Sequence, residues 1–303
     1  MEEDIKYKTI KQLGEGAFGK VYLAKDSSEK LFSLKTLKNI NEKEKEKLGR
    51  EINILSQLNR LKIRNIPIFI ELVENKIRNL NIMVMSYVDG ITMFESKNCL
   101  MNITPPKEQY YKLPASIILN YIYNLSQTME QIHEHNIIHN DLSLKNIIIN
   151  GINSTIIDFG LSYEINNVIL GGTMSYLSPE KALYLFLKKK NKKKKQYGLS
   201  FTEKEQKASD VWAFGVIFYL FTNNIKHMPY FNPAYKARNP GDLDKYYLAI
   251  KDYVPKTNYI DKTQLRYTQF INVIIKSCLH IDFENRITFK EIIDFIENKI
   301  KQS

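Results

Sequence analysis

The N-terminal part of the chain carries short runs of apolar and polar positions that predict β-strands. Across Tyr7–Leu37 the order is strand, glycine-rich turn, strand, a turn at residues 26–28, and a third strand. Two further strand-like runs follow at Ile66–Val73 and Leu80–Tyr87. The pattern therefore predicts a small antiparallel sheet in this part of the chain.

One helix is expected within this sheet region. Asn41 is a suitable N-cap residue, and apolar side chains then recur at three- and four-residue steps. These apolar residues are Leu48, Ile52, Leu55 and Leu58. Glu51 lies at the edge of their stripe, so we expect its carboxylate to point toward the sheet.

Beyond Asp89-Gly90 the pattern changes to the period of α-helices. The strongest predicted helices are Pro114–His135, Ser209–Thr222, Leu243–Asp252, Leu265–Leu279 and Thr288–Ile300. Residues Thr92–Lys112 are poorly patterned and predict a loop that can include one helical turn.

A hairpin is predicted between the first two of these helices. Ile147–Ile149 and Thr155–Ile157 flank an Asn-Gly pair, which favours a tight turn. Such a hairpin brings its two ends, Asn146 and Asp158, next to each other.

These elements predict an α+β fold with two lobes. A chain of 303 residues with 44% hydrophobic content can bury a large core, which excludes full disorder. We expect residues 1–87 to form a sheet-based N-terminal lobe with one main helix. Residues 88–303 are expected to form a larger, mainly α-helical lobe.

Much of the positive charge comes from one segment. The formal net charge is +11, and Lys188–Lys195 holds seven lysines in eight positions. We expect an insertion at about residues 188–207, and its simplest interpretation is a solvated loop, because like charges repel. Docking of an acidic partner, nuclear import, or contact with nucleic acid or anionic lipid are the alternatives, but no aromatic residue interleaves the lysines to stack on bases.

Other features favour a soluble intracellular protein. Cys99 and Cys278 are far apart and outside any metal-ligand spacing, as in a reducing compartment. The N-terminus lacks the apolar stretch of a signal peptide, and the longest apolar run, Val211–Phe221, is too short to span a bilayer. We expect a cytoplasmic monomer, with nuclear entry through the lysine run as an alternative.

The glycine-rich turn is the first candidate for chemistry. Gly14, Gly16 and Gly19 lie between two predicted strands, where glycine lets backbone amides approach phosphate oxygens closely. Alone this spacing also fits a plain hairpin turn. A dinucleotide-binding fold would place a helix after the last glycine, whereas a strand beginning at Val21 follows here.

Five charged or amide side chains complete a site for a nucleotide triphosphate with magnesium. Lys35 on the third strand has a partner in Glu51, which keeps it charged and oriented toward the α- and β-phosphates. Asp141 can accept the proton of an incoming hydroxyl, and the amide oxygen of Asn146 can ligate magnesium. Asp158 then supplies the main magnesium carboxylate. His139, the first residue of the loop that runs to Asn146, is interpreted as a packing residue rather than a base.

With these motifs in this order, the chain resembles a eukaryotic-type protein kinase over nearly its full length. Ser178-Pro179-Glu180 resembles the family's Ala-Pro-Glu, and Asp210–Gly215 matches its Asp-X-Trp-X-X-Gly helix. Arg286 stands where the family places the arginine that pairs with Glu180. The resemblance implies ATP and Mg²⁺ as cofactors and proteins as substrates.

The resemblance also implies a nucleotide pocket, with Met85 as the gatekeeper and Ser86–Val88 as the hinge. The residues implied to contact the nucleotide are Leu13, Gly14, Gly16, Phe18, Gly19, Val21, Ser33, Lys35, Met85, Ser86, Tyr87, Val88 and Ile148. A hydrophobic column of the active state is implied for Leu55, Leu72, His139 and Phe159, with Asp210 at its base.

Three positions near Asp141 depart from the family. Asn140 replaces an arginine that receives an activation-loop phosphate, which predicts activity without that phosphorylation. Ser143 stands where most serine/threonine kinases carry a lysine, and Lys145 where many tyrosine kinases place an arginine. Because basophilic kinases usually carry glutamate at the position of Lys145, a cation there predicts substrates with neutral or acidic surroundings.

The segment Gly172–Glu180 resembles the serine/threonine form, and Thr173 is expected to hydrogen-bond near Asp141 and Lys145. We therefore predict transfer of the γ-phosphoryl group of ATP to serine or threonine in proteins. The alternatives are a dual-specificity kinase, a pseudokinase scaffold that binds ATP, and a small-molecule or lipid kinase.

Overall fold

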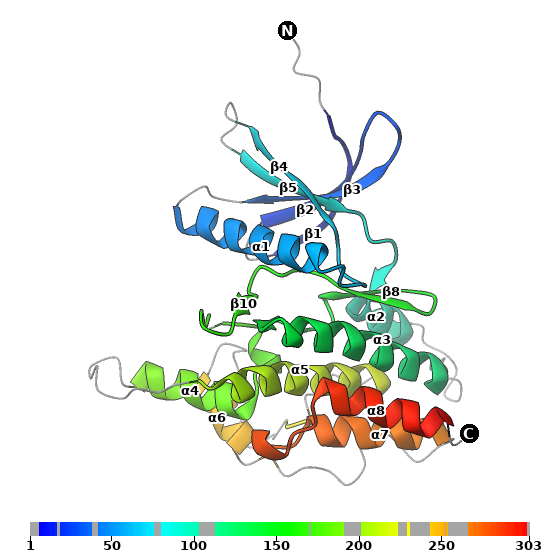
Figure 1. Ribbon diagram of the computed structural model, residues 1–303, viewed down its shortest axis with the longest axis vertical. Coiled ribbons are helices and arrows are strands. Elements are labelled where there is room, and N and C mark those ends of the chain that lie inside the picture. The colour runs from blue at the N-terminus through cyan, green and yellow to red at the C-terminus, as the bar shows by residue number, and fades with distance from the viewer. Residues whose placement is uncertain are drawn as a thin grey trace.

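The molecule has two parts stacked along its long axis, a β-sheet with one helix above and a larger group of helices below (Figure 1). The computed structural model describes residues 6–16, 19–37, 42–75, 80–102, 113–169, 171–190, 201–223, 229–230, 243–251, 253 and 266–301. Phe18, Asn41 and residues 191–200 of the lysine-rich segment lie outside these ranges.

Five antiparallel strands form the upper sheet in the order β1-β2-β3-β5-β4, which confirms the predicted sheet. The strands are β1 (Lys8–Gly16), β2 (Gly19–Lys25), β3 (Leu31–Leu37), β4 (Phe69–Asn75) and β5 (Leu80–Ser86). Lys35 lies on the central strand, opposite Val21 of β2 and Met83 of β5. Because cross-strand partners share a face, these three side chains point to the same side of the sheet.

Helix α1 (Glu42–Arg60) packs beside this sheet, as predicted. Leu48, Leu55 and Leu58 are buried, and Ile52 packs against the same core from a half-buried position. Glu51 is buried with them at 5% exposure, so the helix carries its carboxylate inward.

The lower part is mainly helical. Its helices are α2 (Met93–Asn102), α3 (Ala115–Glu134), α4 (Pro179–Lys190), α5 (Glu203–Asn223), α6 (Leu243–Lys251), α7 (Arg266–Cys278) and α8 (Phe289–Lys301), with short 3₁₀ turns at Met174–Tyr176 and Phe283–Asn285. All five helices predicted for this region are present. No described helix combines the length and the apolar character that a membrane span needs.

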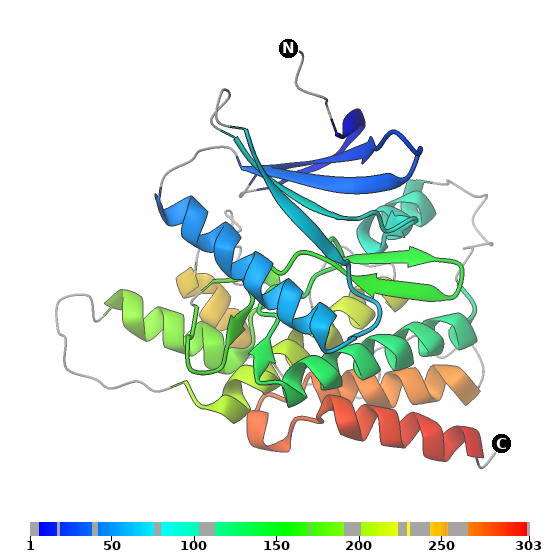
Figure 2. The same ribbon diagram turned by 45° about the horizontal axis from the view of Figure 1, so that its top comes forward.

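A small sheet lies beneath the upper one (Figure 2). The predicted hairpin forms from β8 (Ile147–Asn150) and β9 (Asn153–Ile156), and β6 (Ile91–Thr92) pairs with β8. The backbone N–H of Ile157 donates to Asn146 O at 2.9 Å, which holds the two ends of the hairpin together. The chain leaves the upper sheet after β5 and joins this sheet at β6, so the predicted lobe boundary falls in that connection. A further short pair joins β7 (Ile137–Ile138) to β10 (Tyr163–Glu164).

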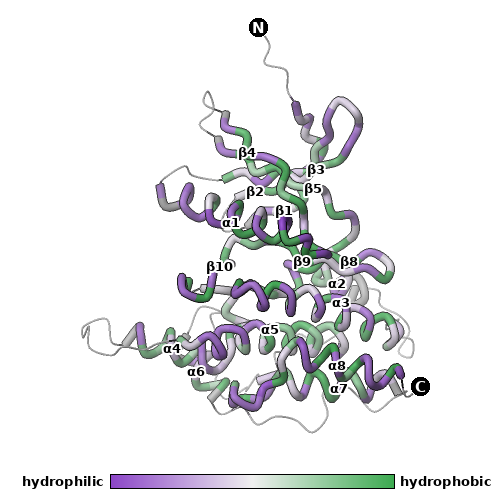
Figure 3. The backbone as a smooth tube through the Cα atoms, viewed as in Figure 1, coloured by the Kyte–Doolittle hydropathy of each residue, from purple (hydrophilic) through white to green (hydrophobic). Residues whose placement is uncertain are grey.

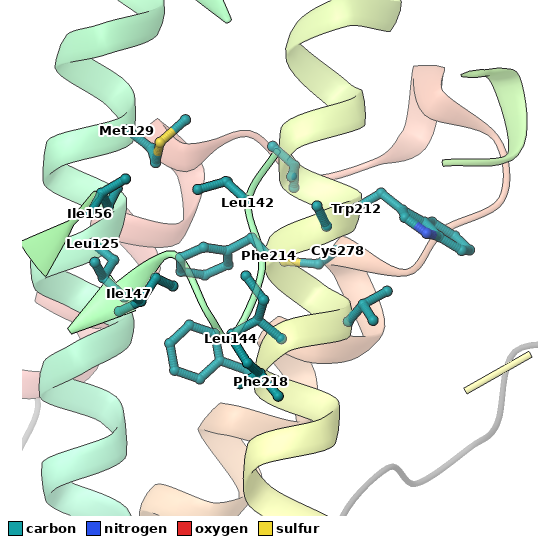
Figure 4. Close-up of a cluster of buried hydrophobic side chains, with 14 of the residues drawn as sticks. Leu125, Met129, Leu142, Leu144, Ile147, Ile156, Trp212, Phe214, Phe218 and Cys278 are labelled. Carbon is teal, nitrogen blue, oxygen red and sulfur yellow. The ribbon is translucent and has the colours of Figure 1, made fainter. Parts of the chain in front are cut away.

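Helix α5 forms the centre of the lower core. It is buried on all sides from Ala208 to Thr222, as expected for a helix that is apolar all round (Figure 3). Leu142 and Leu144, which flank Ser143, insert between α3 and α5 (Figure 4). The loop that carries Asp141 is therefore anchored from below by apolar burial.

Three helices differ from the sequence prediction, and two of them differ at their starts. Residues 93–102 form helix α2 instead of a loop with one turn, and α5 begins at Glu203 rather than at Ser209. Both starts carry a capping box that the prediction overlooked. Thr92 and Glu95 exchange backbone and side-chain hydrogen bonds at α2, and Thr202 and Glu205 do the same at α5.

Helix α4 was not predicted as a helix, and it continues into the first lysines of the run, as far as Lys190. Its first turn is tied to the turn that precedes α8. Arg286 donates to the two oxygens of Glu180 at 2.7 and 3.0 Å, as the resemblance implied, and to Ala208 O at 2.7 Å. Its guanidinium also lies 5.1 Å from the ring of Trp212.

We expect Arg286→Ala to lower the free energy of unfolding by about 3–5 kcal/mol, because it leaves the carboxylate of Glu180 buried without its cation. Lys204→Ala, which removes an exposed ion pair with Glu284, is the matched control and should cost less than about 1 kcal/mol. Urea unfolding followed by far-ultraviolet circular dichroism measures both. Equal losses for the two variants would contradict a structural role for the buried pair.

Candidate active site

A buried ammonium group joins the sheet, helix α1 and the segment that follows the hairpin. Lys35 Nζ lies 2.6 and 2.8 Å from the carboxylate oxygens of Glu51 and 2.7 Å from Asp158 Oδ1. The side chains of Lys35 and Glu51 are 8% and 5% exposed, whereas that of Asp158 is 35% exposed. The predicted pairing of Lys35 with Glu51 is therefore present, and Asp158 is the member that faces outward.

Two carboxylates share one cation in this cluster. Burial lowers the pKa of Lys35, but the charges of Glu51 and Asp158 outweigh it and hold that pKa above its usual value. Burial raises the pKa of Asp158, but Lys35 overcomes this effect and the pKa of Asp158 lies below its usual value. Burial dominates at Glu51 and raises its pKa. The cluster therefore combines a stable cation with an ionised carboxylate at its outer edge.

Asp141 is held in one orientation by its neighbours. Its Oδ1 accepts hydrogen bonds from both the backbone N–H and the hydroxyl of Thr173, each at 2.8 Å. Asn146 Nδ2 donates to Asp141 Oδ2 at 3.2 Å and to its backbone oxygen at 2.8 Å. Thr173 therefore meets Asp141 as predicted, and the carboxylate is placed to accept a proton from a hydroxyl group.

Asn146 and Asp158 fit a magnesium ion bound together with phosphates. The described hydrogen bonds of the Asn146 side chain use Nδ2, which leaves the amide oxygen as a ligand. The described bonds to the Asp158 carboxylate end on Oδ1, which leaves Oδ2. A carboxylate and an amide oxygen are ligands that Mg²⁺ completes with phosphate oxygens and water. Among the described residues, no group of three or more His, Cys, Asp or Glu side chains could hold a metal ion.

Asp210 on α5 supports the catalytic loop from below. Its Oδ2 accepts from His139 N at 2.8 Å and contacts His133 Nε2 at 3.1 Å, while Oδ1 accepts from Asn140 N at 2.9 Å. Burial raises the pKa of Asp210, but the hydrogen bond and charge of His133, with further contacts, outweigh it and leave that pKa below its usual value. An ionised carboxylate thus holds two successive backbone N–H groups just before Asp141.

Three members of the implied hydrophobic column are buried. Leu55, His139 and Phe159 are at most 1% exposed, and the rings of His139 and Phe159 lie 5.0 Å apart. Burial lowers the pKa of His139, which fits a neutral packing residue. Leu72 is 39% exposed, so it does not share this burial. A register shift in β4 between Phe69 and Glu71 precedes it.

The side chains expected around the adenine lie on one face of the sheet and on the hairpin. Ser33 faces Met85 across β3 and β5, and both are half-buried, as are Val21 and Ile148. Leu13 is 39% exposed, at a register shift of β1.

The predicted hinge begins where β5 ends. Ser86 N donates to Ile68 O, and Ile68 N donates to Ser86 Oγ, each at 2.8 Å, so the start of the hinge is tied to the residue preceding β4. Tyr87 and Val88 follow in a half-buried connection.

The glycine-rich turn needs glycine at one described position above all. Gly19 has a φ of +154°, and a Cβ there would lie 1.8 Å from Thr36 O, so no other residue fits. Gly16 pairs with Gly19 across the turn, and open space surrounds the position of a Cβ at Gly14.

Thr173 meets Asp141, whereas its expected approach to Lys145 stays a prediction. The ammonium of Lys145 lies 5.1 Å from the centroid of the Phe94 ring. Helix α2, which was not expected from the sequence, brings this ring beside the loop, because Phe94 N donates to Leu144 O at 2.9 Å. Lys145 is exposed there.

The sequence analysis also missed Lys181, which donates a hydrogen bond to Asn140 Oδ1 although it belongs to helix α4. In a chain with 44 lysine and arginine residues, no local pattern distinguishes this lysine from the others. Only its burial, at 3% exposure, separates it from solvated surface charges.

A bilobal fold with this ion cluster, aspartate loop and glycine turn is the arrangement of the protein kinase class. The model of the protein kinase domain matches residues 7–295, and the chain belongs to this family. Members of the family use ATP with Mg²⁺.

Curated relatives include several serine/threonine kinases. The chain is 33% identical over 187 residues to human serine/threonine-protein kinase Nek5, covering 58% of this chain and 24% of that protein. It is 27% identical over 283 residues to zebrafish inhibitor of nuclear factor kappa-B kinase subunit alpha, covering 84% of this chain and 33% of that protein. It is 26% identical over 303 residues to calcium-dependent protein kinase 4 of Plasmodium falciparum, covering 94% of this chain and 50% of that protein. The chain thus spans a quarter to a half of the length of these relatives.

Proposed function

We propose that this protein transfers the γ-phosphoryl group of ATP to serine or threonine hydroxyls of protein substrates. The observation that carries the proposal is a series of contacts between segments far apart in the sequence. Lys35 pairs with Asp158, and Ile157 beside it hydrogen-bonds Asn146. Asn146 in turn donates to Asp141. Kinase relatives that act on serine and threonine support the acceptor class.

Each residue has a distinct role in this reaction. Bound Mg²⁺ would offset the negative charge of the phosphates, with Asp158 and Asn146 as its protein ligands. Lys35 orients the α- and β-phosphates and is itself oriented by Glu51. Asp141 accepts the proton of the substrate hydroxyl. The hydroxyl oxygen then forms a bond to the γ-phosphorus, while the bond between that phosphorus and ADP breaks. Thr173 and Asn146 keep the Asp141 carboxylate aimed.

The alternative functions keep less support. Pseudokinases usually lack one of the groups that occupy positions 35, 141 and 158, and here all three are present and in contact with their expected neighbours. A small-molecule or lipid kinase is disfavoured by the intact Glu180–Arg286 pair and the Asp210 anchor, which we expect to support a groove for a polypeptide. Dual specificity is the second candidate, because Ser143 and Lys145 depart from the serine/threonine pattern.

We also propose that activity does not require phosphorylation of the activation segment, which comprises residues 159–180. Asn140 Nδ2 donates to Leu161 O at 2.9 Å and to Ile169 O at 3.3 Å. A neutral amide thus holds both positions of this segment by hydrogen bonds alone. An arginine at that position would instead need an anionic partner, such as a phosphate.

The exposed ammonium of Lys145 supports the predicted preference for neutral or acidic substrates. It stands above Phe94 on the rim of the site, where it would repel a cationic peptide.

We further propose an intracellular location and an acidic partner for the lysine run. The first rests on the cysteine spacing and the second on the charge of Lys188–Lys195.

We expect Asp141→Asn to lower transfer of labelled phosphate to myelin basic protein by about 10² to 10⁴, because the variant lacks the proton acceptor but keeps the size of the side chain. Asp294→Asn, at an exposed site on α8, should behave as the wild type. Phosphoamino-acid analysis should give phosphoserine and phosphothreonine. Phosphotyrosine would indicate dual specificity, and a wild-type protein that binds ATP without transfer would indicate a pseudokinase.

Treatment of the purified protein with a broad phosphatase should leave kcat within about twofold, because the contacts of Asn140 need no phosphate. Mass spectrometry of the segment 159–180 verifies that phosphate has been removed. A loss of tenfold or more, restored by rephosphorylation, would refute activation-loop independence.

Lys145→Glu should shift preference toward peptides with arginine upstream of the acceptor by at least about tenfold in kcat/KM, since it replaces repulsion by attraction. The measurement compares matched peptide pairs, with Lys290→Glu on α8 as the control for an exposed charge change. Unchanged peptide ratios would remove Lys145 from substrate recognition.

A further inference from the structure

Lys181 is a buried cation directly beneath the catalytic loop. Its residue exposure is 3%, and its ammonium donates to Asn140 Oδ1. A lysine is rarely buried unless polar partners compensate for the loss of water. The position of Lys181 therefore needs a reason beyond the helical pattern of α4.

The partner of Lys181 connects the catalytic loop to other segments. Asn140 receives Lys181 on its amide oxygen and uses its amide nitrogen for Leu161 O and Ile169 O. Its backbone N–H donates to Asp210 Oδ1, and its φ of +68° is one that asparagine tolerates well. One amide side chain thus links α4 and the activation segment immediately before Asp141.

Three acidic groups, from three different segments, act on the ammonium of Lys181. Asp141 comes from the catalytic loop, Asp210 from α5 and Glu180 from α4, where Glu180 is also paired with Arg286. A pocket of about 10 Å³, with space for about one water molecule, is lined by residues that include Asp141, Lys181 and Asp210. Burial lowers the pKa of Lys181 to about 8, and the three carboxylates limit the fall.

The activation segment also passes close to this ammonium. Gly172 has a φ of +107°, and a Cβ there would lie 2.7 Å from Asn140 O and 3.4 Å from Lys181 Nζ. The backbone just before Thr173 therefore runs against both Asn140 and Lys181. Thr173 is in turn the residue that holds Asp141 Oδ1.

We propose that Lys181 is a positioning residue for phosphate transfer: its positive charge, acting through Asn140, holds the catalytic loop and the activation segment in the arrangement that aims Asp141. The proposal rests on the proposed kinase function and deepens it. It names a cation of the protein itself that orders the activation segment without a phosphate group. Without the ammonium, Asn140 Oδ1 loses its donor, and Asp141 and Asp210 lose the cation that lies near both.

Lys181 Nζ and Asn140 Oδ1 are in direct contact, so the cation can be moved from one residue to the other, and this makes the proposal testable by exchange. Asn140→Arg alone would place a second buried cation beside Lys181, where like charges repel strongly at low dielectric. Lys181→Met alone leaves the carboxylates without a cation but keeps a side chain of similar length. The double variant Asn140→Arg/Lys181→Met restores a single cation on the opposite side of the contact.

The experiment compares the wild type with these three variants in the full chain. Each single variant should lower kcat for a protein substrate by about tenfold to hundredfold, the range expected for a lost hydrogen bond to a charged group. The KM for ATP should stay within about twofold, because Lys35 and the nucleotide site are untouched. The kcat of the double variant should be at least about fivefold higher than that of the less active single variant. A double variant no better than that single variant, or a fully active Lys181→Met, overturns the proposal.

A pH profile separates charge from mere packing. The wild-type kcat should fall as the pH rises through about 8, since the ammonium then loses its proton. Lys181→Arg keeps the charge at all these pH values, so it should retain activity at pH 7 and move this alkaline limb upward by at least one pH unit. An unchanged limb in an active Lys181→Arg variant overturns the role of the charge.

A structural measurement keeps the proposal testable apart from catalysis. Hydrogen exchange of residues 161–169 should be at least about tenfold faster in Lys181→Met than in the wild type, while exchange in α3 and α5 stays equal and shows that the variant is folded. If the wild type shows no phosphate transfer, the proposed function fails. The exchange rates then still decide the positioning role, and equal rates in segment 161–169 overturn it.

Discussion

The arrangement of the site depends on the burial of one ammonium group between two carboxylates. Lys35 comes from the sheet, Glu51 from a helix and Asp158 from the end of a hairpin 123 residues further along the chain. A buried charge is tolerated only when it is paired, so each of these segments must reach the same place for the fold to form. Because two negative charges share one positive charge, the cluster retains the negative excess that suits a metal ion with phosphates.

A second buried charge network holds the loop that faces this cluster. Asp210 binds the backbone N–H groups of His139 and Asn140, and Leu142 and Leu144 anchor the next residues in the core. The polar anchors precede Asp141 along the loop and the apolar anchors follow it. Support from the buried part of α5 therefore fixes the loop on both sides of Asp141.

Most of the fold follows from local patterns. The strands, the glycine turn, the hairpin and helix α1 were predicted because their periodicity and turn residues act over a few positions. Helix α2 was not predicted because its apolar spacing is weak. Its stronger signal was the capping box of Thr92 and Glu95, which the prediction did not use. The early start of α5 was missed because the capping box at Thr202 was likewise not used.

By itself, the sequence determined the class of fold and the family. Its motifs name the lysine, the aspartates and the asparagine of the candidate site. Tertiary structure alone decided where the other lysines lie relative to that site. Lys145 lies over Phe94 and Lys181 lies under Asn140 because of how α2 and α4 pack on the loop. The environment of a charge is set by neighbours distant in sequence, and no periodicity along the chain records them.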